Sequence, residues 1–299
     1  AVCGIIVATF IGFTAGVLRL SNNFVLSKLM QVYVEITRNV PVLLQILLWH
    51  GIIIHSLPVP KKAEPLIEGL ILTNRGVFLP EPIGQAGFGW VWIAFFIGII
   101  FAICFKRYAT KLQMETGKLL PSIWIGLAAI IILPLIVFFA LGAPLEISYP
   151  ELKGFNYRGG FVVKPEFLAL WFALSLYTGA FIAEIVRAGI ESVNKGQSEA
   201  AHALGIKPSF TMRLVVIPQA LRVIIPPLIS QYLNLTKNSS LAIAIGYMDI
   251  VATLGGISLN QTGRALESMA IVLGVYLFIS IVISACMNVY NARVAIVSR

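Results

Sequence analysis

The segment between residues 188 and 218 carries an unusual arrangement of small and charged side chains. Glu199 is followed directly by Ala200 and Ala201, and Arg213 stands later in the same segment. The chemistry that these residue types permit is docking. Small side chains let another protein surface approach closely, and Glu199 and Arg213 can pair with charges on that surface. Docking of this kind needs the segment to hold one defined shape.

Capping residues predict that this segment forms two short helices joined by a turn. Ser198 can cap the first helix and place an acid in its first turn, where a negative charge is favourable. Gly205 stands where a left-handed residue ends a helix. The pair Lys207-Pro208 prevents simple continuation, and Ser209 can cap a second helix. We expect a helix–turn–helix here and call residues 188–218 the elbow.

The composition of the chain requires a membrane around these elements. Of the 299 residues, 58% are hydrophobic and 12% are charged, against about 45–50% and about 25% in soluble domains. A soluble fold of this length cannot hide so much apolar surface, because it must also present a charged exterior. We expect an integral membrane protein with no nucleic acid partner, in which the net charge of +9 reflects topology.

Seven apolar stretches are long enough to cross about 30 Å of hydrocarbon. They are Val2–Leu18, Val40–Leu57, Phe88–Phe105, Leu119–Leu141, Phe167–Ala188, Pro218–Leu235 and Met269–Tyr290. An eighth run, Ser240–Ile257, contains Asp249 and three glycines, so we expect a short buried or re-entrant helical segment there. The predicted fold class is an all-α polytopic membrane protein.

The distribution of Lys and Arg sets the orientation of these spans. With the loop after the first span in the cytoplasm, fourteen of them lie inside, Arg293 and Arg299 included, and eight lie outside beside eight acids. This arrangement places the elbow in the cytoplasm. Seven crossings with a cytoplasmic C-terminus leave Ala1 outside, so we expect one further span upstream and eight in the full chain.

No stretch outside the membrane is long enough to build a core of its own, so residues 1–299 are expected to form one transmembrane domain. Within it, residues 58–165 contain two of the seven spans, Phe88–Phe105 and Leu119–Leu141. The outer segments 58–87 and 142–166 contain many Pro and Gly residues. We expect these segments to be irregular or short-helical.

Two sets of polar residues lie within or beside the spans. Glu184 and Arg187 are three residues apart on one helical face, a spacing that allows pairing. They lie at an inner gate or against the elbow, or they form a structural ion pair between helices. The second set faces a substrate pathway or outer gate, or belongs to a solvated helix end. Its members are Asn234, Thr236, Lys237, Asn238, Ser239 and Ser240.

Two further groups of residues, the polar side chains of the second span and the cysteines, receive simpler assignments. Gln45 lies on the second span and is assigned to the pathway, whereas His50 and His55 are assigned to packing or to the lumen. Cys3, Cys104 and Cys286 share no short spacing, so we expect small hydrophobic side chains and neither a disulfide framework nor a metal site.

The elbow also carries a resemblance to a known family. Glu199-Ala200-Ala201, Gly205, Val215 and Ile217-Pro218 reproduce the spacing of the Glu-Ala-Ala signature of ABC importer permease subunits, which ends Ile-x-Leu-Pro where this chain has Val-x-Ile-Pro. In that family the elbow is a coupling helix that docks on a separate ATPase. The resemblance therefore implies a coupling role for Glu199, Ala200, Ala201, Gly205, Lys207, Arg213 and Pro218. The alternative is an amphipathic helix lying on lipid.

Flanking sequences narrow the resemblance. Residues 33–45, 177–190, 218–227 and 235–241 resemble the polar amino-acid permease branch. Compared with the five-span core usual for that branch, residues 58–165 are an insertion with two extra spans. This enlarged form resembles the permeases of general L-amino-acid importers. This resemblance implies a type I importer permease domain in the bacterial inner membrane. Its implied partners are an ATP-binding subunit in two copies, a related or identical second permease, an extracytoplasmic amino-acid-binding protein and membrane lipid.

The resemblance also implies that this chain is no enzyme and binds no cofactor, and that ATP and Mg²⁺ bind the partner ATPase. Consistently, the sequence contains no G-x-x-x-x-G-K-[ST], H-E-x-x-H or CxxC pattern. One alternative is an ion-driven secondary transporter or channel for small polar solutes, which calls for unpaired intramembrane acids and repeated spans. Another is a membrane enzyme acting on lipid, which calls for a His/Asp/Glu cluster at one face.

Overall fold

A computed structural model describes the backbone of residues 1–294 and the side chains of residues 1–289. Arg299 lies outside the described residues, and the side chain of Arg293 is likewise not described. The chain divides into two compact units. Unit 1 contains residues 1–57 and the chain from Lys164 onward, and unit 2 contains residues 58–163. The insertion expected at 58–165 therefore forms a compact unit of its own.

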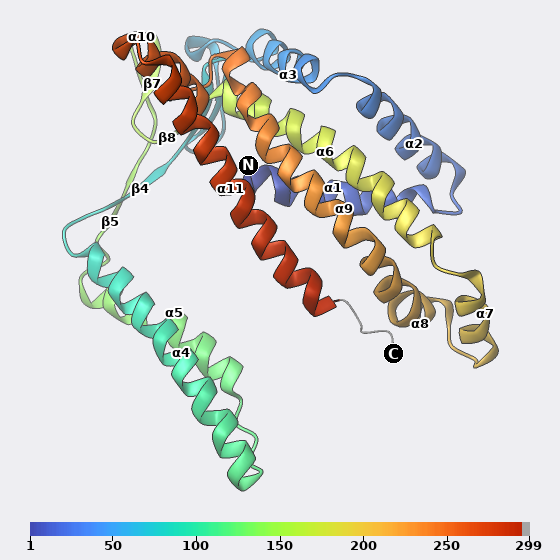
Figure 1. The fold of residues 1–299 in the computed structure, drawn as a ribbon. Coiled ribbons are helices and arrows are strands. Elements are labelled where there is room, and N and C mark those ends of the chain that lie inside the picture. Colours follow the sequence, from blue (N-terminus) through green and yellow to red (C-terminus); the bar gives the residue numbers. More distant parts are fainter. Residues whose placement is uncertain (295–299) are drawn as a thin grey trace. The chain divides into compact units, whose positions relative to one another are not determined.

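Unit 1 is entirely helical in its described part (Figure 1). Its α-helices are α1 (Val2–Arg19), α2 (Phe24–Asn39), α3 (Val42–Ser56), α6 (Pro165–Glu191), α7 (Lys195–Ala203), α8 (Pro208–Thr211), α9 (Ile217–Asn238), α10 (Leu259–Thr262) and α11 (Ala265–Val294). Met212–Val216 and Val251–Ser258 are π-helical, and Ser239–Ile245 is a 3₁₀ helix. Ser239–Ile245 and Val251–Ser258 confirm that the run Ser240–Ile257, where no crossing was expected, forms short helical segments.

Six helices in the described chain are long and apolar enough to cross a membrane, or seven if α2 and α3 together form one broken span. The crossing predicted at Val40–Leu57 is present only as part of this bent pair. Only α3, with 15 residues, lies there, and it meets α2 at a bend of 107°. Pro41 explains the break, because the residue before a proline avoids the helical region, and Val40 is indeed extended.

Helices α1 and α6 approach each other closely through glycines. A Cβ atom on Gly12 would lie 2.5 Å from the Cβ of Ile182, and one on Gly16 would lie 2.7 Å from the Ala183 carbonyl oxygen. Both glycines are buried. Side chains from α1, α3, α6 and α9 then complete the main hydrophobic core of unit 1. Helix α6, which has buried residues along its whole length, is the centre of this packing.

Unit 2 combines a helical hairpin with short antiparallel strands. Helices α4 (Phe88–Thr116) and α5 (Ser122–Ala140) are the two extra spans. The outer segments contain a short 3₁₀ helix, Pro60–Lys62, and eight strands. They are β1 (Pro65–Ile67), β2 (Leu70–Thr73), β3 (Gly76–Leu79), β4 (Glu81–Gly84), β5 (Leu145–Ser148), β6 (Glu151–Lys153), β7 (Asn156–Arg158) and β8 (Phe161–Val163).

The expectation that these outer segments are irregular or short-helical is therefore wrong. Strands β1, β2, β3 and β8 form one sheet, and β4–β5 and β6–β7 form separate pairs. The physical reason lies in β2 and β3, where burial alternates with a period of two, as strands require. Some of the Pro and Gly residues lie at turns between strands, as Gly69 and Gly154 do with positive φ, whereas Pro65, Pro82 and Gly84 lie within short strands.

We predict that Gly12→Ala lowers the free energy of unfolding of the detergent-solubilised protein by about 1–3 kcal/mol, because the added methyl overpacks the α1–α6 contact. The measurement is thermal unfolding. Gly274→Ala in α11 is the matched control, since a Cβ there meets nothing within 4 Å. An unchanged melting temperature for Gly12→Ala would contradict the close packing.

Candidate coupling site

The elbow begins without a loose linker. At the end of α6, the Ser192 amide donates to the Ala188 carbonyl (2.9 Å) and its hydroxyl donates to the Gly189 carbonyl (2.8 Å). Asn194 then caps α7, and its Oδ1 accepts from the Gly196 amide at 2.8 Å. Hydrogen bonds therefore connect α6 to α7 almost continuously.

The prediction that Ser198 is the first cap is wrong, because Ser198 lies inside α7. Asn194 is an equally good capping residue, and it begins the helix four residues earlier. Glu199 consequently lies in the middle of α7 and outside its first turn. The prediction missed this start because several residues in the stretch can cap a helix.

The end of α7 confirms the role expected of Gly205. Its φ of 73° is left-handed. Its amide donates to the His202 carbonyl at 2.9 Å, and the Ile206 amide donates to the Ala201 carbonyl at 3.1 Å. These two hydrogen bonds are the pair that defines a Schellman motif, so the backbone itself ends the helix.

The second helix starts differently from the prediction. Lys207 is the N-cap of α8, with extended backbone angles, and Pro208 is its first residue. Ser209 therefore lies inside α8, so its predicted capping role is wrong. Proline suits this position because its φ is already helical and its missing amide has no partner to lose. The chain continues through a π-helical turn into α9, whose first turn contains Pro218.

The elbow presents one covered side and one open side. Ala201, Thr211 and Val216 are buried, and the Gln219 amide of α9 donates to the Gln197 side chain of α7 at 3.4 Å. Leu204, by contrast, is 80% exposed. Of the residues assigned to coupling, Ala201 is buried, and those that are exposed are Glu199, Ala200, Gly205, Lys207, Arg213 and Pro218.

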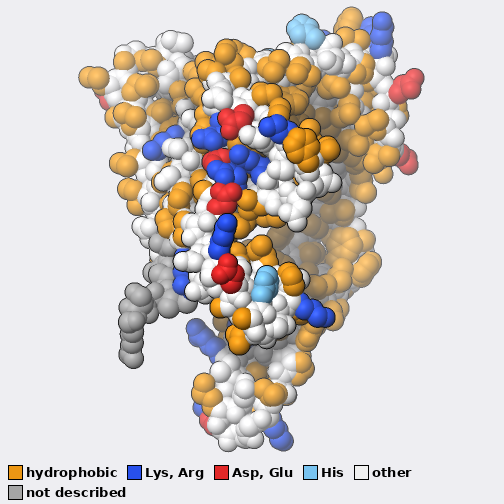
Figure 2. Space-filling view, turned by 90° about the vertical axis from the view of Figure 1, so that its right-hand side faces the viewer, with side chains coloured by type: hydrophobic (Ala, Val, Ile, Leu, Met, Phe, Trp, Pro, Cys, Tyr) orange, Lys and Arg blue, Asp and Glu red, His pale blue; other side chains and the backbone are white. Residues whose placement is uncertain are grey.

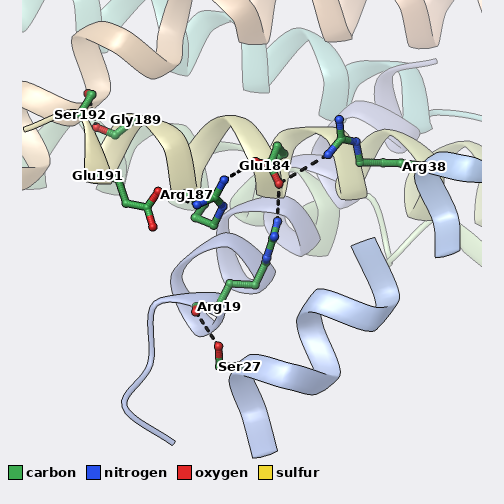
Figure 3. Close-up of polar contacts among 8 residues, drawn as sticks. All are labelled: Arg19, Ser27, Arg38, Glu184, Arg187, Gly189, Glu191 and Ser192. Carbon is green, nitrogen blue, oxygen red and sulfur yellow. Dashed lines mark hydrogen bonds and ion pairs between the residues drawn. The ribbon is translucent and has the colours of Figure 1, made fainter. Parts of the chain in front are cut away.

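Just before the elbow, one carboxylate gathers three arginines (Figure 3). Glu184 Oε2 accepts from Arg19 Nη1 at 2.5 Å and lies 3.5 Å from Arg38 Nη1, while Oε1 accepts from Arg187 Nη2 at 2.6 Å. Arg187 also pairs with Glu191 at 2.5 Å. The pairing of Glu184 with Arg187 is confirmed. The residues form a wider network that ties together α1, α2 and α6.

Sequence reasoning missed Arg19, Arg38 and Glu191 as members of this network. A signal was present, because the distribution of Lys and Arg places Arg19 and Arg38 on the same side as Arg187. Charges that share one depth near the membrane are expected to seek partners among themselves. On the face that carries α2 and α7, acidic and basic side chains gather in one band between apolar areas (Figure 2).

The outer polar cluster divides between two surfaces. Thr236, Ser239 and Asp249 contribute to a cavity of about 630 Å³, whereas Lys237 and Ser240 line a separate one of about 310 Å³. The hydroxyls of the cluster donate to carbonyls of α9, as Thr236 Oγ1 does to the Tyr232 carbonyl at 2.8 Å and Ser239 Oγ does to the Thr236 carbonyl at 2.7 Å. Asn234 is exposed and Asn238 is half-buried.

Gln45 has a defined structural contact at the bend between α2 and α3. Its Nε2 donates to the Thr37 carbonyl at 2.8 Å and to the Val40 carbonyl at 2.9 Å. These carbonyls belong to the end of α2, where no helical partner remains for them. Gln45 therefore closes the bend. Its assignment to the pathway stays a prediction.

The described residues contain no group of three or more His, Cys, Asp or Glu side chains that could hold a metal ion. The arrangement of the elbow and the ion network is suited to transmitting a displacement. A capped elbow leaves one surface open, and an ion network secures the helix that leads into it.

Residues 8–296 match the family described as the binding-protein-dependent transport system inner membrane component. The chain belongs to this family. It is therefore a membrane-spanning permease component of ABC transporters, as the signature at the elbow predicted. Membership implies a separate subunit that hydrolyses ATP and a second permease subunit.

Three curated relatives illustrate the match. The general L-amino acid transport system permease AapQ of Rhizobium johnstonii is 52% identical over all of this chain and 74% of its own length. The putative amino-acid ABC transporter permease YhdX of Escherichia coli is 50% identical over all of this chain and 76% of its own. The permease BztB of Rhodobacter capsulatus, named for glutamate, glutamine, aspartate and asparagine transport, is 45% identical over 95% of this chain and 73% of its own.

A solved structure, described as an amino acid ABC transporter with histidines, shares the fold. It matches 97% of this chain and 87% of its own, with a TM-score of 0.54 and 20% identity. This likeness confirms the predicted type I importer permease fold. The chain is mostly helical, and the prediction of an all-α fold is corrected by the strands of unit 2.

We predict that Gly205→Val loosens the elbow, because a β-branched residue is strained at a φ of 73°. The measurement is limited proteolysis of residues 194–208 in the purified protein, with faster cleavage expected. Gly205→Asn is the control, since asparagine tolerates this conformation. Equal cleavage of Gly205→Val and the unchanged chain would show that the motif does not hold the elbow.

Proposed function

We propose that this chain is the permease subunit of an ATP-driven importer for amino acids and forms half of its translocation pathway. The observation that carries the proposal is the elbow, which is rigidly capped and keeps an exposed apolar side chain, Leu204, on its open surface. The names of the three relatives support amino acids as the substrate class.

The proposed importer is assembled at the bacterial inner membrane from this permease and three kinds of partner. Two ATP-binding subunits bind ATP and Mg²⁺ and supply the energy of hydrolysis, and a related or identical permease completes the pathway. An extracytoplasmic binding protein delivers the amino acid. The positions of Lys and Arg support an elbow on the cytoplasmic side, where the ATPase subunits are found.

The structure suggests how the elbow transmits force. Approach of the two ATPase subunits on ATP binding draws the elbows together and opens the pathway outward. A flexible loop would absorb such a displacement, whereas packed elements shift as rigid bodies. The hydrogen bonds at Asn194 and Gly205 and the continuous turn after α6 make the elbow an element of the second kind.

The substrate pathway is proposed to include the outer polar cluster. Thr236 and Ser239 lie at a cavity large enough for an amino acid. The remaining members, Asn234, Lys237, Asn238 and Ser240, extend the same helix end and the segment after it. Gln45, Glu184 and Arg187 lie nearer the predicted inner side. They would influence the pathway by setting the positions of the helices that carry them.

The alternative of an ion-driven carrier receives less support. Such carriers use intramembrane acids that bind and release an ion. Glu184 is instead held by arginines at 2.5 and 2.6 Å, and Asp249 accepts a hydrogen bond from the Ala252 amide at 2.8 Å.

We predict that Leu204→Asp abolishes association with the ATPase, because a charge replaces the apolar side chain that meets the partner surface. The measurement is the amount of ATPase that purifies with the tagged permease. Leu266→Asp is the matched control, since Leu266 is 85% exposed and is placed on the outer side. ATPase recovery equal to that of the unchanged chain would contradict docking through α7.

A further inference from the structure

The network around Glu184 has an uneven charge balance. It contains the guanidinium groups of Arg19, Arg38 and Arg187 against the carboxylates of Glu184 and Glu191. Glu184 alone contacts all three cations. The side chain of Arg19 is 9% exposed and that of Glu184 is 25% exposed, so solvent screens these charges weakly. The positions of the three arginines therefore depend on one shared carboxylate.

The contacts of Glu184 differ in strength between the two neighbouring helices. Toward α1, the Arg19 contact of 2.5 Å follows directly after the tight glycine contacts at Gly12 and Gly16. Toward α2, the contact to Arg38 is 3.5 Å long, and the Arg38 guanidinium also lies over the Phe181 ring, 5.3 Å from its centroid. Helix α1 is thus fixed to α6 by close packing. Helix α2 packs on α6 through buried Val34 and through the Tyr33 hydroxyl, which donates to the Leu176 carbonyl at 2.7 Å. Beyond these contacts, its last turn is joined to α6 by Arg38.

The end of α2 leads directly into the bend before α3. Arg38 is two residues from Val40, whose carbonyl accepts from Gln45. At the other end of the network, Arg187 pairs with Glu191, the last residue of α6, and α7 begins after a three-residue turn. A connected path of polar contacts therefore runs from the elbow through Arg187, Glu184 and Arg38 to the bend.

We propose that Glu184 is a positioning residue that transmits displacement of the elbow to the bend between α2 and α3. As α6 moves with the elbow, the carboxylate carries Arg38 along, and Arg38 changes the angle between α2 and α3. Gln45 keeps the bend closed during this movement. The inference rests on the proposed function, because it assigns to Glu184 a role in coupling ATP hydrolysis to transport.

Glu184→Gln removes the shared negative charge and leaves three cations beside one another. We expect the Arg38 end of α2 to separate from α6. Coupling free energies between sites commonly correspond to fold-changes of about 5–150. Transport per ATP hydrolysed should therefore fall about tenfold, while the ATPase remains bound and active.

The experiment uses the complete importer in liposomes, with both permeases, the ATPase and the loaded binding protein. Amino-acid uptake, ATP hydrolysis and the melting temperature of the complex are measured together. Arg38→Gln/Glu184→Gln should lower transport per ATP no further than Glu184→Gln alone, because the contact between the two residues is already lost in the single variant. Arg38→Gln alone should lower transport per ATP less than Glu184→Gln. Glu115→Gln is the matched control, since Glu115 pairs with Lys111 at 3.7 Å on an exposed face of α4.

Normal transport per ATP in Glu184→Gln would overturn the inference. The inference would also be overturned if Arg38→Gln lowered the melting temperature and the amount of assembled complex without changing transport per ATP. That result would indicate an ion pair with a structural role alone. If Glu184→Gln does not assemble, reduced transport per ATP in assembled Arg38→Gln supports the inference. Absence of ATP-dependent uptake by the unchanged complex would instead contradict the proposed function.

Discussion

The close approach of α1 to α6 is the constraint on which the rest of unit 1 depends. It is possible only because Gly12 and Gly16 have no side chain where α6 passes. With the helices this near, Arg19 at the end of α1 reaches Glu184 at 2.5 Å. The carboxylate is thereby available to Arg38 and Arg187 as well. Packing of small residues thus creates the polar network that secures the helix leading to the elbow.

The elbow itself shows how a very short helix can be made rigid. A nine-residue helix is unstable in water, because too few hydrogen bonds repay the cost of nucleation. Here Asn194 satisfies a free amide at one end, and the Schellman motif satisfies two carbonyls at the other. Burial of Ala201 adds a packing contact on the inner side. The open side, with Leu204, is left for a partner.

Patterns that repeat over many residues were predictable from the sequence, whereas local choices were not. The apolar runs predicted most spans, and Gly205 predicted the end of α7, because a left-handed position favours few residue types. Ser198 was predicted to cap α7, whereas Asn194 caps it, because both residue types can cap a helix and only the fold decides between them. The strands of unit 2 were missed because the frequent Pro and Gly residues indicated loops, while the period-two burial of short strands such as β2 and β3 was overlooked. Arg19 and Arg38 were missed as partners of Glu184 because they are distant from it along the chain, Arg19 by 165 residues.

The most direct test of the central claim is purification of this chain from its native membrane, with identification of its partners and an ATPase assay. The account predicts that an ATP-hydrolysing subunit purifies with it in stoichiometric amount and that an amino-acid-loaded binding protein stimulates its activity. A chain that purifies alone and moves solute into liposomes without ATP would contradict it.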